Sequence, residues 1–218
     1  MSQSLLSIQD LNVAIDRIPI LRNVNMEVPK GAMVGLIGRN GAGKTTLIRS
    51  IMGLMPVDAK KLEVNGENLV NVASHGRATR GISYLPEDRR LIPSLTVEEN
   101  VLLPSWANGI KDSAERLQWI YSLMPEVKEF RDRRALQLSG GQQKLVALAR
   151  ALMPGRTLLL LDEPFEGVAP VLSRRLTEVI ATLRSTGMSI ILSESDDTHS
   201  ADLVDRVFRI ERGVVTAG

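Results

Sequence analysis

Apolar and polar positions near the start of the chain follow the pattern expected of strands. The runs Leu5 to Ile15 and Ile18 to Val28 are typical strand sequences, and the charged residues Asp16 and Arg17 lie between them as a turn. Two strands joined by so short a turn pair antiparallel. We therefore expect an N-terminal antiparallel sheet that lies beside the rest of the fold.

Further apolar runs predict the strands of a core sheet. The run Thr157 to Leu161 is apolar from Leu158 onwards and is followed by acidic residues, which indicates a strand buried on both faces. The pair Asn65 and Gly66 is a strong turn signal. The other predicted strands cover residues 33–37, 61–64, 81–85, 189–192 and 204–210.

Helical spacing of apolar residues dominates from Thr96 to about Ala151. Thr96 is followed by acidic residues, as expected of a helix N-cap, and residues 114–124 form a further amphipathic segment. Pro170 opens a later helix. Its apolar face is predicted to contain Val171, Leu172, Leu176, Val179, Ile180 and Leu183. The chain is thus predicted to be one α/β domain, residues 1–218, with a helical subdomain at about 92–151.

Composition excludes several classes of protein. The chain has 218 residues, of which 44% are hydrophobic, so it can bury a sizeable core and is not intrinsically disordered. The formal net charge is only +2, and the one dense basic cluster, at Arg131, Arg133 and Arg134, is interpreted as a solvated face. We therefore expect no nucleic-acid partner. The sequence contains no cysteine and two histidines, which argues against disulfides and a zinc centre.

No secretory signal and no apolar run of membrane-spanning length is evident in the sequence. We expect the chain to be cytoplasmic and to reach any membrane through a partner protein.

A phosphate-binding loop follows the predicted strand at 33–37. Glycines at 38 and 43 and the pair Lys44 and Thr45 match the P-loop pattern, and a helical segment comes next. Glycine lets main-chain N–H groups point into one concavity, where Lys44 reaches the terminal phosphates and the Thr45 hydroxyl binds Mg²⁺. A chance glycine-rich turn would lack the flanking strand and helix. The residues expected to bind the nucleotide here are Gly38, Arg39, Asn40, Gly41, Ala42, Gly43, Lys44, Thr45 and Thr46.

A second acidic motif follows the leucine run at 158–161. A buried parallel strand would place Asp162 and Glu163 at its carboxyl end, beside the P-loop. Asp162 is expected to bind Mg²⁺ through water, and Glu163 to polarise the water that attacks the γ-phosphorus. The alternative is an acidic turn after a strand, which is common in α/β proteins.

The third motif is LSGGQ at 138–142, at the start of a helical segment. Its residues Ser139, Gly140, Gly141 and Gln142 predict a second phosphate-binding corner at a helix N-terminus. One nucleotide does not need two such corners within one chain. We therefore expect the corner of one chain to close over the γ-phosphate held by another chain, with ATP in the interface. A serine N-cap alone would explain one residue of the five.

The order of these three motifs resembles that of the ATP-binding cassette ATPases, and the resemblance covers essentially the whole chain. More narrowly, YLPEDRRLIPSLTVEENV at 84–101, WIYSLMP at 119–125 and DEPFEGVAP at 162–170 resemble the smaller ATPase subunit of bacterial importers for branched-chain amino acids, urea and similar solutes. The resemblance implies a mixed core sheet around the P-loop, an N-terminal antiparallel sheet and a helical subdomain. It also implies ATP and Mg²⁺ as cofactors.

The resemblance assigns roles to further residues. Glu87 matches the position that senses Mg²⁺ and meets the membrane partner, and Ala169 with Pro170 match the loop after the acidic motif. Ile15 stands where most cassettes stack an aromatic on adenine, which predicts weak base selectivity. Ser195 stands where most cassettes have a switch histidine. His199, four residues later, is expected to be an ordinary surface residue.

The function implied is ATP hydrolysis that powers import, with a second cassette ATPase, two membrane permease subunits and, indirectly, a solute-binding protein as partners. The chain would lie at the inner face of the cell membrane. Two rival classes fit the sequence less well. A DNA-repair or translation cassette carries long coiled coils or two cassettes in one chain, and neither is present here. The LSGGQ motif argues against a nucleotide kinase. Ser195 and Ile15 keep a third alternative open: a degenerate cassette that completes a partner's site and hydrolyses little ATP itself.

Overall fold

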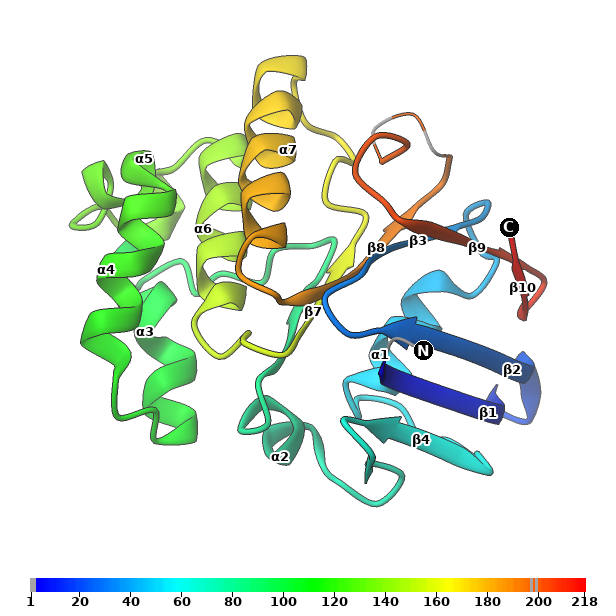
Figure 1. Cartoon of the computed structure of the whole chain (residues 1–218). Helices are drawn as coiled ribbons and strands as arrows, with labels where there is room; N and C mark the ends of the chain where they lie inside the picture. Colours follow the sequence, from blue (N-terminus) through cyan, green and yellow to red (C-terminus); the bar gives the residue numbers. More distant parts are fainter. Residues whose placement is uncertain (1–2, 197, 199) are drawn as a thin grey trace.

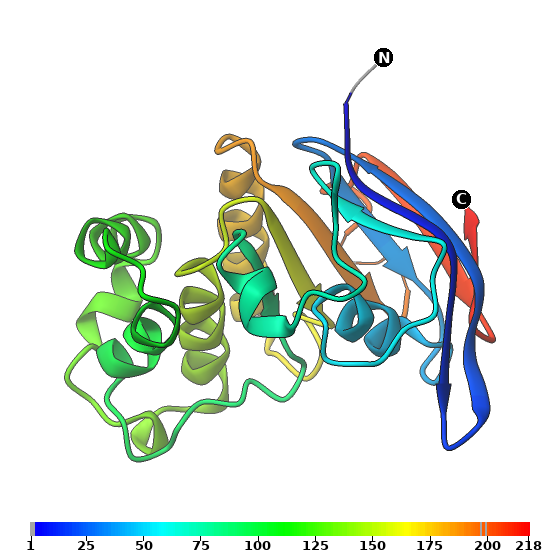
Figure 2. The same cartoon turned by 90° about the horizontal axis from the view of Figure 1, so that it is seen from below.

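Two β-sheets organise the chain, and most of the helices gather on the side of the larger sheet that faces away from the N-terminal strands (Figure 1). The computed structural model describes residues 3–196, 198 and 200–218. A view from below shows the same arrangement, with the N-terminal strands along one edge of the molecule and the helices at the other (Figure 2). The elements are mixed α/β, as predicted.

The N-terminal sheet is antiparallel and has the strand order β2-β1-β4-β5. The pair β1 (Ser4–Ile15) and β2 (Ile18–Pro29) forms the hairpin that the sequence predicts. The strand β4 (Lys61–Val64) pairs with β1, and the short β5 (Glu67–Asn68) continues the sheet. The predicted antiparallel sheet is confirmed, with two strands more than the hairpin.

The core sheet is mixed and has the order β10-β9-β3-β8-β7-β6. Its neighbours pair in parallel, except for the antiparallel pair of β9 and β10. The strands are β3 (Met33–Ile37), β6 (Ile82–Leu85), β7 (Leu158–Asp162), β8 (Ser189–Glu194), β9 (Arg206–Glu211) and β10 (Val214–Ala217).

The leucine run explains how the core sheet is buried on both faces. Leu158 and Leu160 join the apolar cluster that lies between the two sheets, whereas Leu159 and Leu161 join the cluster beneath the helices. Successive side chains of a strand point to opposite faces. A strand covered on both sides therefore needs apolar residues at every position, as the sequence predicts for this segment.

The helices around the core sheet are α1 (Lys44–Ile51), α2 (Ser74–Ala78), α3 (Val97–Asn108), α4 (Ser113–Leu123), α5 (Pro125–Glu129), α6 (Gly140–Leu152) and α7 (Pro170–Arg184), with a 3₁₀ turn at Ala135–Gln137. Thr96 caps α3 reciprocally with Glu99, which confirms the predicted N-cap. Within the part of the chain described, no helix combines the length and the apolar character needed to cross a bilayer.

The structure corrects several sequence predictions. Val171 is 71% exposed, although its spacing predicts a place on the apolar face of α7. It precedes Leu176 by five residues, which places it about 140° around the helix from the buried stripe. The strand predicted at 204–210 is β9, which begins at Arg206 rather than Val204, because the residues before it form a turn. The short elements α2, β5 and β10 have no clear periodicity and were not predicted.

A buried arginine fixes the far end of the P-loop helix. Arg77 of α2 is 2% exposed, and its guanidinium donates to the carbonyls of Ser50 and Ile51 at the carboxyl end of α1, at 2.9 and 2.8 Å. It also donates to the carbonyls of Val72 and Leu69. A cation at the carboxyl end of a helix satisfies carbonyls that have no intrahelical partner. Burial lowers the pKa of Arg77.

We predict that Arg77→Met lowers the free energy of unfolding by about 3 kcal/mol, because the four hydrogen bonds from the buried guanidinium to main-chain carbonyls are lost. Urea unfolding followed by circular dichroism measures this. Arg80→Met is the matched control, since Arg80 donates to Glu67 at the surface. If both substitutions lowered the free energy of unfolding equally, the buried contacts of Arg77 would stabilise the fold no more than the surface contacts of Arg80.

Candidate functional site

The P-loop connects β3 to α1 and is supported from behind by the turn between β9 and β10. Gly41 and Gly43 have φ values of 80° and 112°, which glycine adopts without strain. A Cβ atom on Gly38 would lie 2.3 Å from the Ile210 carbonyl oxygen. The N–H of Gly213 donates to the Ala42 carbonyl at 2.9 Å. The loop is therefore held by β9 and β10, which come from the other end of the sequence.

A hollow opens in front of the P-loop. It is lined by Asn40, Gly41, Gly43, Lys44, Thr45 and Thr46 of the loop, by the acidic residues Glu87, Glu163 and Glu166, and by Ile20 of β2. A second hollow, on the other side of the loop, is lined by residues 37–42 together with Ser195 and the end of β9. The structure thus gathers the predicted phosphate-binding residues, Gly38 to Thr46, around two faces of one loop.

Ile15 lies away from this hollow. It is the last residue of β1, pairs with Ile18 across the hairpin turn, and is 42% exposed. Ile20, two positions further along β2, is the aliphatic residue that lines the P-loop hollow. The assignment of Ile15 to the adenine base therefore stays a prediction, and Ile20 is a further aliphatic candidate for that surface.

Lys44 is 4% exposed, and its ammonium is directed into the site. Nζ lies 2.9 Å from Oε1 of Glu163, and it donates to the carbonyls of Gly38 and Arg39. Lysine side chains usually extend into water and are mobile there, whereas a buried ammonium that donates to main-chain carbonyls is held in one position. The arrangement therefore presents a fixed positive charge inside the loop, where an anionic phosphate would compete with the Glu163 carboxylate.

Asp162 is fully buried at the carboxyl end of β7. Its carboxylate accepts hydrogen bonds from the hydroxyls of Ser193 at 2.8 Å, Thr45 at 3.1 Å and Tyr84 at 3.1 Å. Burial raises the pKa of Tyr84, and the negative charge of Asp162 adds to the effect. Tyr84 therefore stays protonated and continues to donate.

The donor set around Asp162 suits Mg²⁺. A hydroxyl and a carboxylate, here Thr45 Oγ1 and Asp162 Oδ1, lie within 3.1 Å of one another, and Mg²⁺ usually takes one or two such protein oxygens together with phosphate oxygens and water. Glu87 is exposed, in the loop after β6, and lines the same hollow. Its role towards the metal stays a prediction.

Glu163 has an unusual main-chain conformation. Its φ is 46°, in the left-handed region that a residue with a side chain rarely adopts. Its N–H donates to the carbonyl and the hydroxyl of Ser193, at 3.2 and 3.1 Å, and its carbonyl accepts from Lys144 Nζ at 3.1 Å. Strained residues persist where the surroundings hold them on several sides, and such residues gather at functional sites.

The Glu163 side chain carries a negative charge at neutral pH. Burial acts to raise its pKa, but hydrogen bonds from Glu166 and Lys44 and the charge of Lys44 outweigh burial, so the pKa lies below its ordinary value. The hydrogen bond with Glu163 raises the pKa of Glu166, and the negative charge of Glu163 adds to this. Of the two carboxyl groups, Glu166 is therefore the one that binds a proton more readily.

Ser195 follows β8 and contacts the P-loop and the acidic motif together. Its hydroxyl lies 2.8 Å from Asn40 Oδ1 and 3.2 Å from Glu163 Oε2, and both are acceptors. The hydroxyl has one proton and donates to one acceptor at a time. The structure therefore brings Ser195 directly to Glu163. His199 lies outside the described residues.

The LSGGQ residues fulfil local roles at the start of α6. Ser139 is the N-cap, and its hydroxyl and the Gln142 side chain each bond the other residue's N–H, at 3.3 and 3.0 Å. A Cβ atom on Gly141 would lie 2.9 Å from Leu172, and one on Gly140 would lie 3.2 Å from Arg89. The capping box thus gives both Ser139 and Gln142 a local structural role, whereas a serine N-cap alone would account only for Ser139. Residues 138–142 do not line the hollows around the P-loop.

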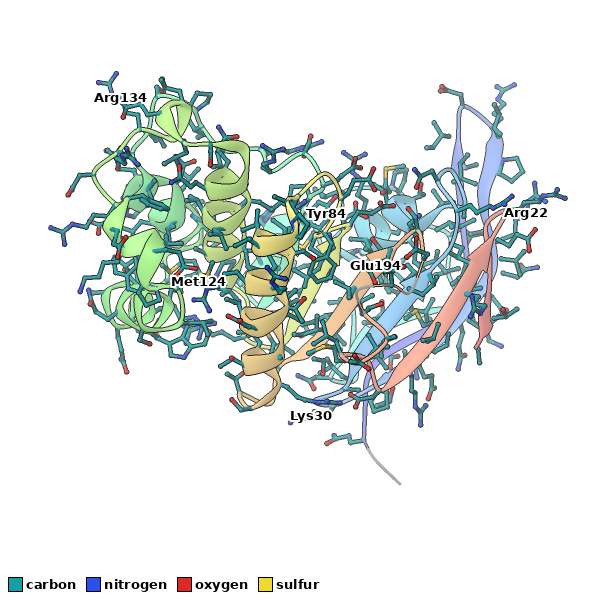
Figure 3. All side chains as sticks on the ribbon, turned by 90° about the horizontal axis from the view of Figure 1, so that it is seen from above. Arg22, Lys30, Tyr84, Met124, Arg134 and Glu194 are labelled. Atoms are coloured by element: carbon teal, nitrogen blue, oxygen red, sulfur yellow. The ribbon has the colours of Figure 1, made fainter. Side chains whose placement is uncertain are left out.

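Four residues that were not predicted from the sequence join the site: Tyr84, Lys144, Glu166 and Ser193. Tyr84 and Ser193 stand at or near the carboxyl ends of strands beside β7, which is the edge where parallel strands place polar side chains. In Figure 3, Tyr84 and Glu194 lie at the middle of the molecule, between Arg134 on the helices and Arg22 on the N-terminal sheet. Lys144 could have been suspected from the sequence, because it is a lysine among the apolar residues of α6.

Known proteins resemble this chain over almost its full length. A model of the ABC transporter family matches residues 21–166. The high-affinity branched-chain amino acid transport ATP-binding protein BraG of Pseudomonas aeruginosa is 36% identical over 96% of this chain and 90% of BraG. The lipopolysaccharide export system ATP-binding protein LptB of Haemophilus influenzae is 31% identical over 98% of this chain and 90% of LptB.

Solved structures share the fold. A nucleotide-free ATP-binding cassette of an ABC transporter has a TM-score of 0.87 at 24% identity, covering 99% of this chain and 91% of that one. An ATP-binding subunit of an ABC transporter has a TM-score of 0.84 at 29% identity, covering 98% and 89%.

The chain belongs to the ABC transporter family. It is an ATPase subunit of a transporter, and ATP with Mg²⁺ is its cofactor. Proteins of this class pair with one another and work with transmembrane permease subunits.

We predict that Lys44→Ala weakens ATP binding at least 100-fold, because the terminal phosphates lose their direct cation and Glu163 is left without its partner. Isothermal calorimetry with Mg-ATP measures this. Lys61→Ala, which removes a partly exposed lysine of β4, is the control. Unchanged affinity of the Lys44 variant would contradict the assignment of this loop to the phosphates.

Proposed function

We propose that this chain hydrolyses ATP to power an importer of branched-chain amino acids or of a similar small polar solute. The observation that carries the proposal is the likeness to BraG, at 36% identity over nearly the whole chain. LptB of Haemophilus influenzae and LptB of Escherichia coli are 31% and 30% identical, so lipopolysaccharide export is the competing assignment. The solute itself would be selected by other subunits.

The geometry supports a role for each charged group of the site. Lys44 would bind the terminal phosphates, and Thr45 with Asp162 would hold Mg²⁺, which supplies charge neutralisation at those phosphates. Glu163 is the proposed general base, because its carboxylate is ionised, lines the P-loop hollow and lies beside Lys44. The Ser195 hydroxyl, 3.2 Å from Oε2, would orient this carboxylate.

The proposed ATP site is completed by a second cassette subunit. Residues 138–142 lie at the N-terminus of α6 and do not line the P-loop hollows of their own chain. Main-chain N–H groups at a helix N-terminus favour anions. We infer that Ser139, Gly140, Gly141 and Gln142 close over the nucleotide bound to the P-loop of the partner, which is either a second copy or a related ATPase.

Permease subunits would anchor the chain at the inner face of the cell membrane. An apolar groove lies between α2 and α3, lined by Met52, Leu54, Ala78, Ile82 and Pro104 among others. Leu54 is 45% exposed there. A short apolar segment of a permease fits this surface by burial of apolar area. A solute-binding protein would act through the permease without contacting this chain.

A degenerate cassette is the second candidate. It is favoured by one observation, that Ser195 stands where a histidine would reach the γ-phosphate. A serine is shorter, and in this structure its hydroxyl is engaged by Asn40 and Glu163. Losing one preorganised contact to developing charge commonly lowers turnover roughly 10²- to 10³-fold. Such a chain would complete its partner's site while hydrolysing ATP slowly at its own.

We predict that Ser195→His raises the ATPase rate of this chain's own site roughly tenfold or more, because imidazole adds a second donor near the transferred phosphoryl group. Phosphate release by the purified chain measures this. Ser139→Arg should leave ATP binding at the chain's own P-loop intact but disable the assembled transporter, since it blocks the corner offered to the partner. Rapid turnover by the unmodified chain that Ser195→His does not change would exclude the degenerate alternative.

Uptake by cells tests the substrate. Cells that lack the gene for this chain should lose uptake of radiolabelled leucine, isoleucine or a small amide, and the unmodified gene should restore it where the Lys44→Ala gene does not. Normal uptake of these solutes, together with copurification of permeases from an export system, would contradict the importer assignment.

A further inference from the structure

A buried lysine connects three parts of the site that the proposed mechanism treats separately. Lys144 lies in the second turn of α6 and is 1% exposed. Its ammonium donates to the carbonyl of Glu163 at 3.1 Å and to the carbonyl of Glu87 at 3.3 Å. The one side chain therefore joins the helix that begins with LSGGQ, the loop after β6 and the main chain of the proposed general base.

A lysine that is almost completely buried, as Lys144 is, is unusual in a folded protein. Burying an ammonium is unfavourable unless its donors are satisfied, and long charged side chains normally extend to the surface. Burial lowers the pKa of Lys144, and the nearby charge of Arg89 adds to this. The hydrogen bonds it makes to described residues go to main-chain carbonyls of the two loops. A leucine or methionine would fill the same volume without this penalty.

The hydrogen bond from Lys144 to Glu163 is made to the residue of the site that has a strained main-chain conformation. Glu163 has a φ of 46°, and the peptide unit on its N-terminal side is held by Ser193. The peptide unit on its C-terminal side is held by Lys144 and by the N–H of Glu166, at 3.2 Å. These contacts fix the direction in which the side chain leaves the main chain.

The loop after β6 is attached to α6 by other residues as well. Arg150 donates to the carbonyls of Arg89 and Arg90, and Arg89 donates to Gln143 Oε1 at 3.2 Å. This loop and α6 are therefore connected at several points. Lys144 differs from Arg150 because its ammonium also reaches Glu163.

We propose that Lys144 is a positioning residue, which couples the Glu87 loop and α6 to the main chain of Glu163 and so keeps the Glu163 carboxylate aimed into the P-loop hollow. The proposal rests on the role given to Glu163 under the proposed function. It predicts that Lys144 affects turnover and not nucleotide binding, because its hydrogen bonds go to Glu87 and Glu163 rather than to the phosphate-binding residues.

Steady-state hydrolysis of radiolabelled Mg-ATP by the purified full-length chain tests this, because the radiolabel detects slow rates. Lys144→Met keeps an unbranched side chain that is one atom shorter and removes its donors. We expect its kcat to fall roughly 10- to 100-fold, as for a misplaced catalytic group, while the Kd for ATP stays within threefold. Lys144→Arg, which retains a cation and its donors, should recover most of the rate.

Arg150→Met is the matched control, since Arg150 holds the same loop without reaching Glu163, and its kcat should stay within about threefold of the unmodified chain. Lys144→Gln, shorter and neutral, is the second variant if the methionine variant does not fold, and it should also lose rate. A folded Lys144→Met or Lys144→Gln chain with unchanged kcat, or with only a raised KM, would overturn the proposal.

Glu163→Gln, run in parallel, separates the two proposals. If this variant hydrolyses ATP at the original rate, the role of Glu163 as base is wrong. If it is inactive while the Lys144 variants are fully active, only the positioning role of Lys144 is wrong.

Discussion

The pairing of Lys44 with Glu163 is the interaction on which the site depends. Two groups of opposite charge, both largely buried, lie 2.9 Å apart at the junction of the P-loop and the acidic motif. Removing either partner would leave an unpaired charge in a place with little access to water. A phosphate placed in the P-loop would bring several negative charges to the same ammonium. Lys44 would then exchange one anionic partner for another, and Glu163 would be released towards water.

The architecture of the core sheet produces this pairing. The parallel strands β3, β7 and β8 are neighbours, and their carboxyl ends deliver the P-loop, Asp162 with Glu163, and Ser195 to one edge. The hydroxyls of Thr45, Ser193 and Tyr84 surround Asp162, so this fully buried carboxylate is satisfied by neutral donors. A rigid, hydrogen-bonded edge of this kind holds catalytic groups more accurately than mobile loops would.

The parts of the molecule that could be predicted from the sequence are those whose structure depends on local chemistry. The P-loop glycines, the Thr96 N-cap and the run Leu158 to Leu161 each follow from rules that act within a few residues. The support of the P-loop by Ile210 and Gly213 could not be predicted, because it depends on how β9 comes to lie beside β3.

Side-chain contacts between distant segments were beyond prediction for the same reason. Tyr84 reaches Asp162 and Lys144 reaches Glu163 only because β6, β7 and α6 pack together in the folded chain. The resemblance places Ser195 in the nucleotide site, but its direct contact with Glu163 depends on side-chain geometry that the sequence does not encode locally.

The affinity of the Glu163→Gln variant for Mg-ATP tests most directly whether Lys44 and Glu163 serve the same phosphate. Glutamine has the size of glutamate, but it neither competes for Lys44 as an anion nor repels a γ-phosphate. Calorimetry should therefore give a Kd for this variant that is roughly tenfold lower than that of the unmodified chain, equivalent to about 1.4 kcal/mol. An unchanged or higher Kd would contradict this account of the site.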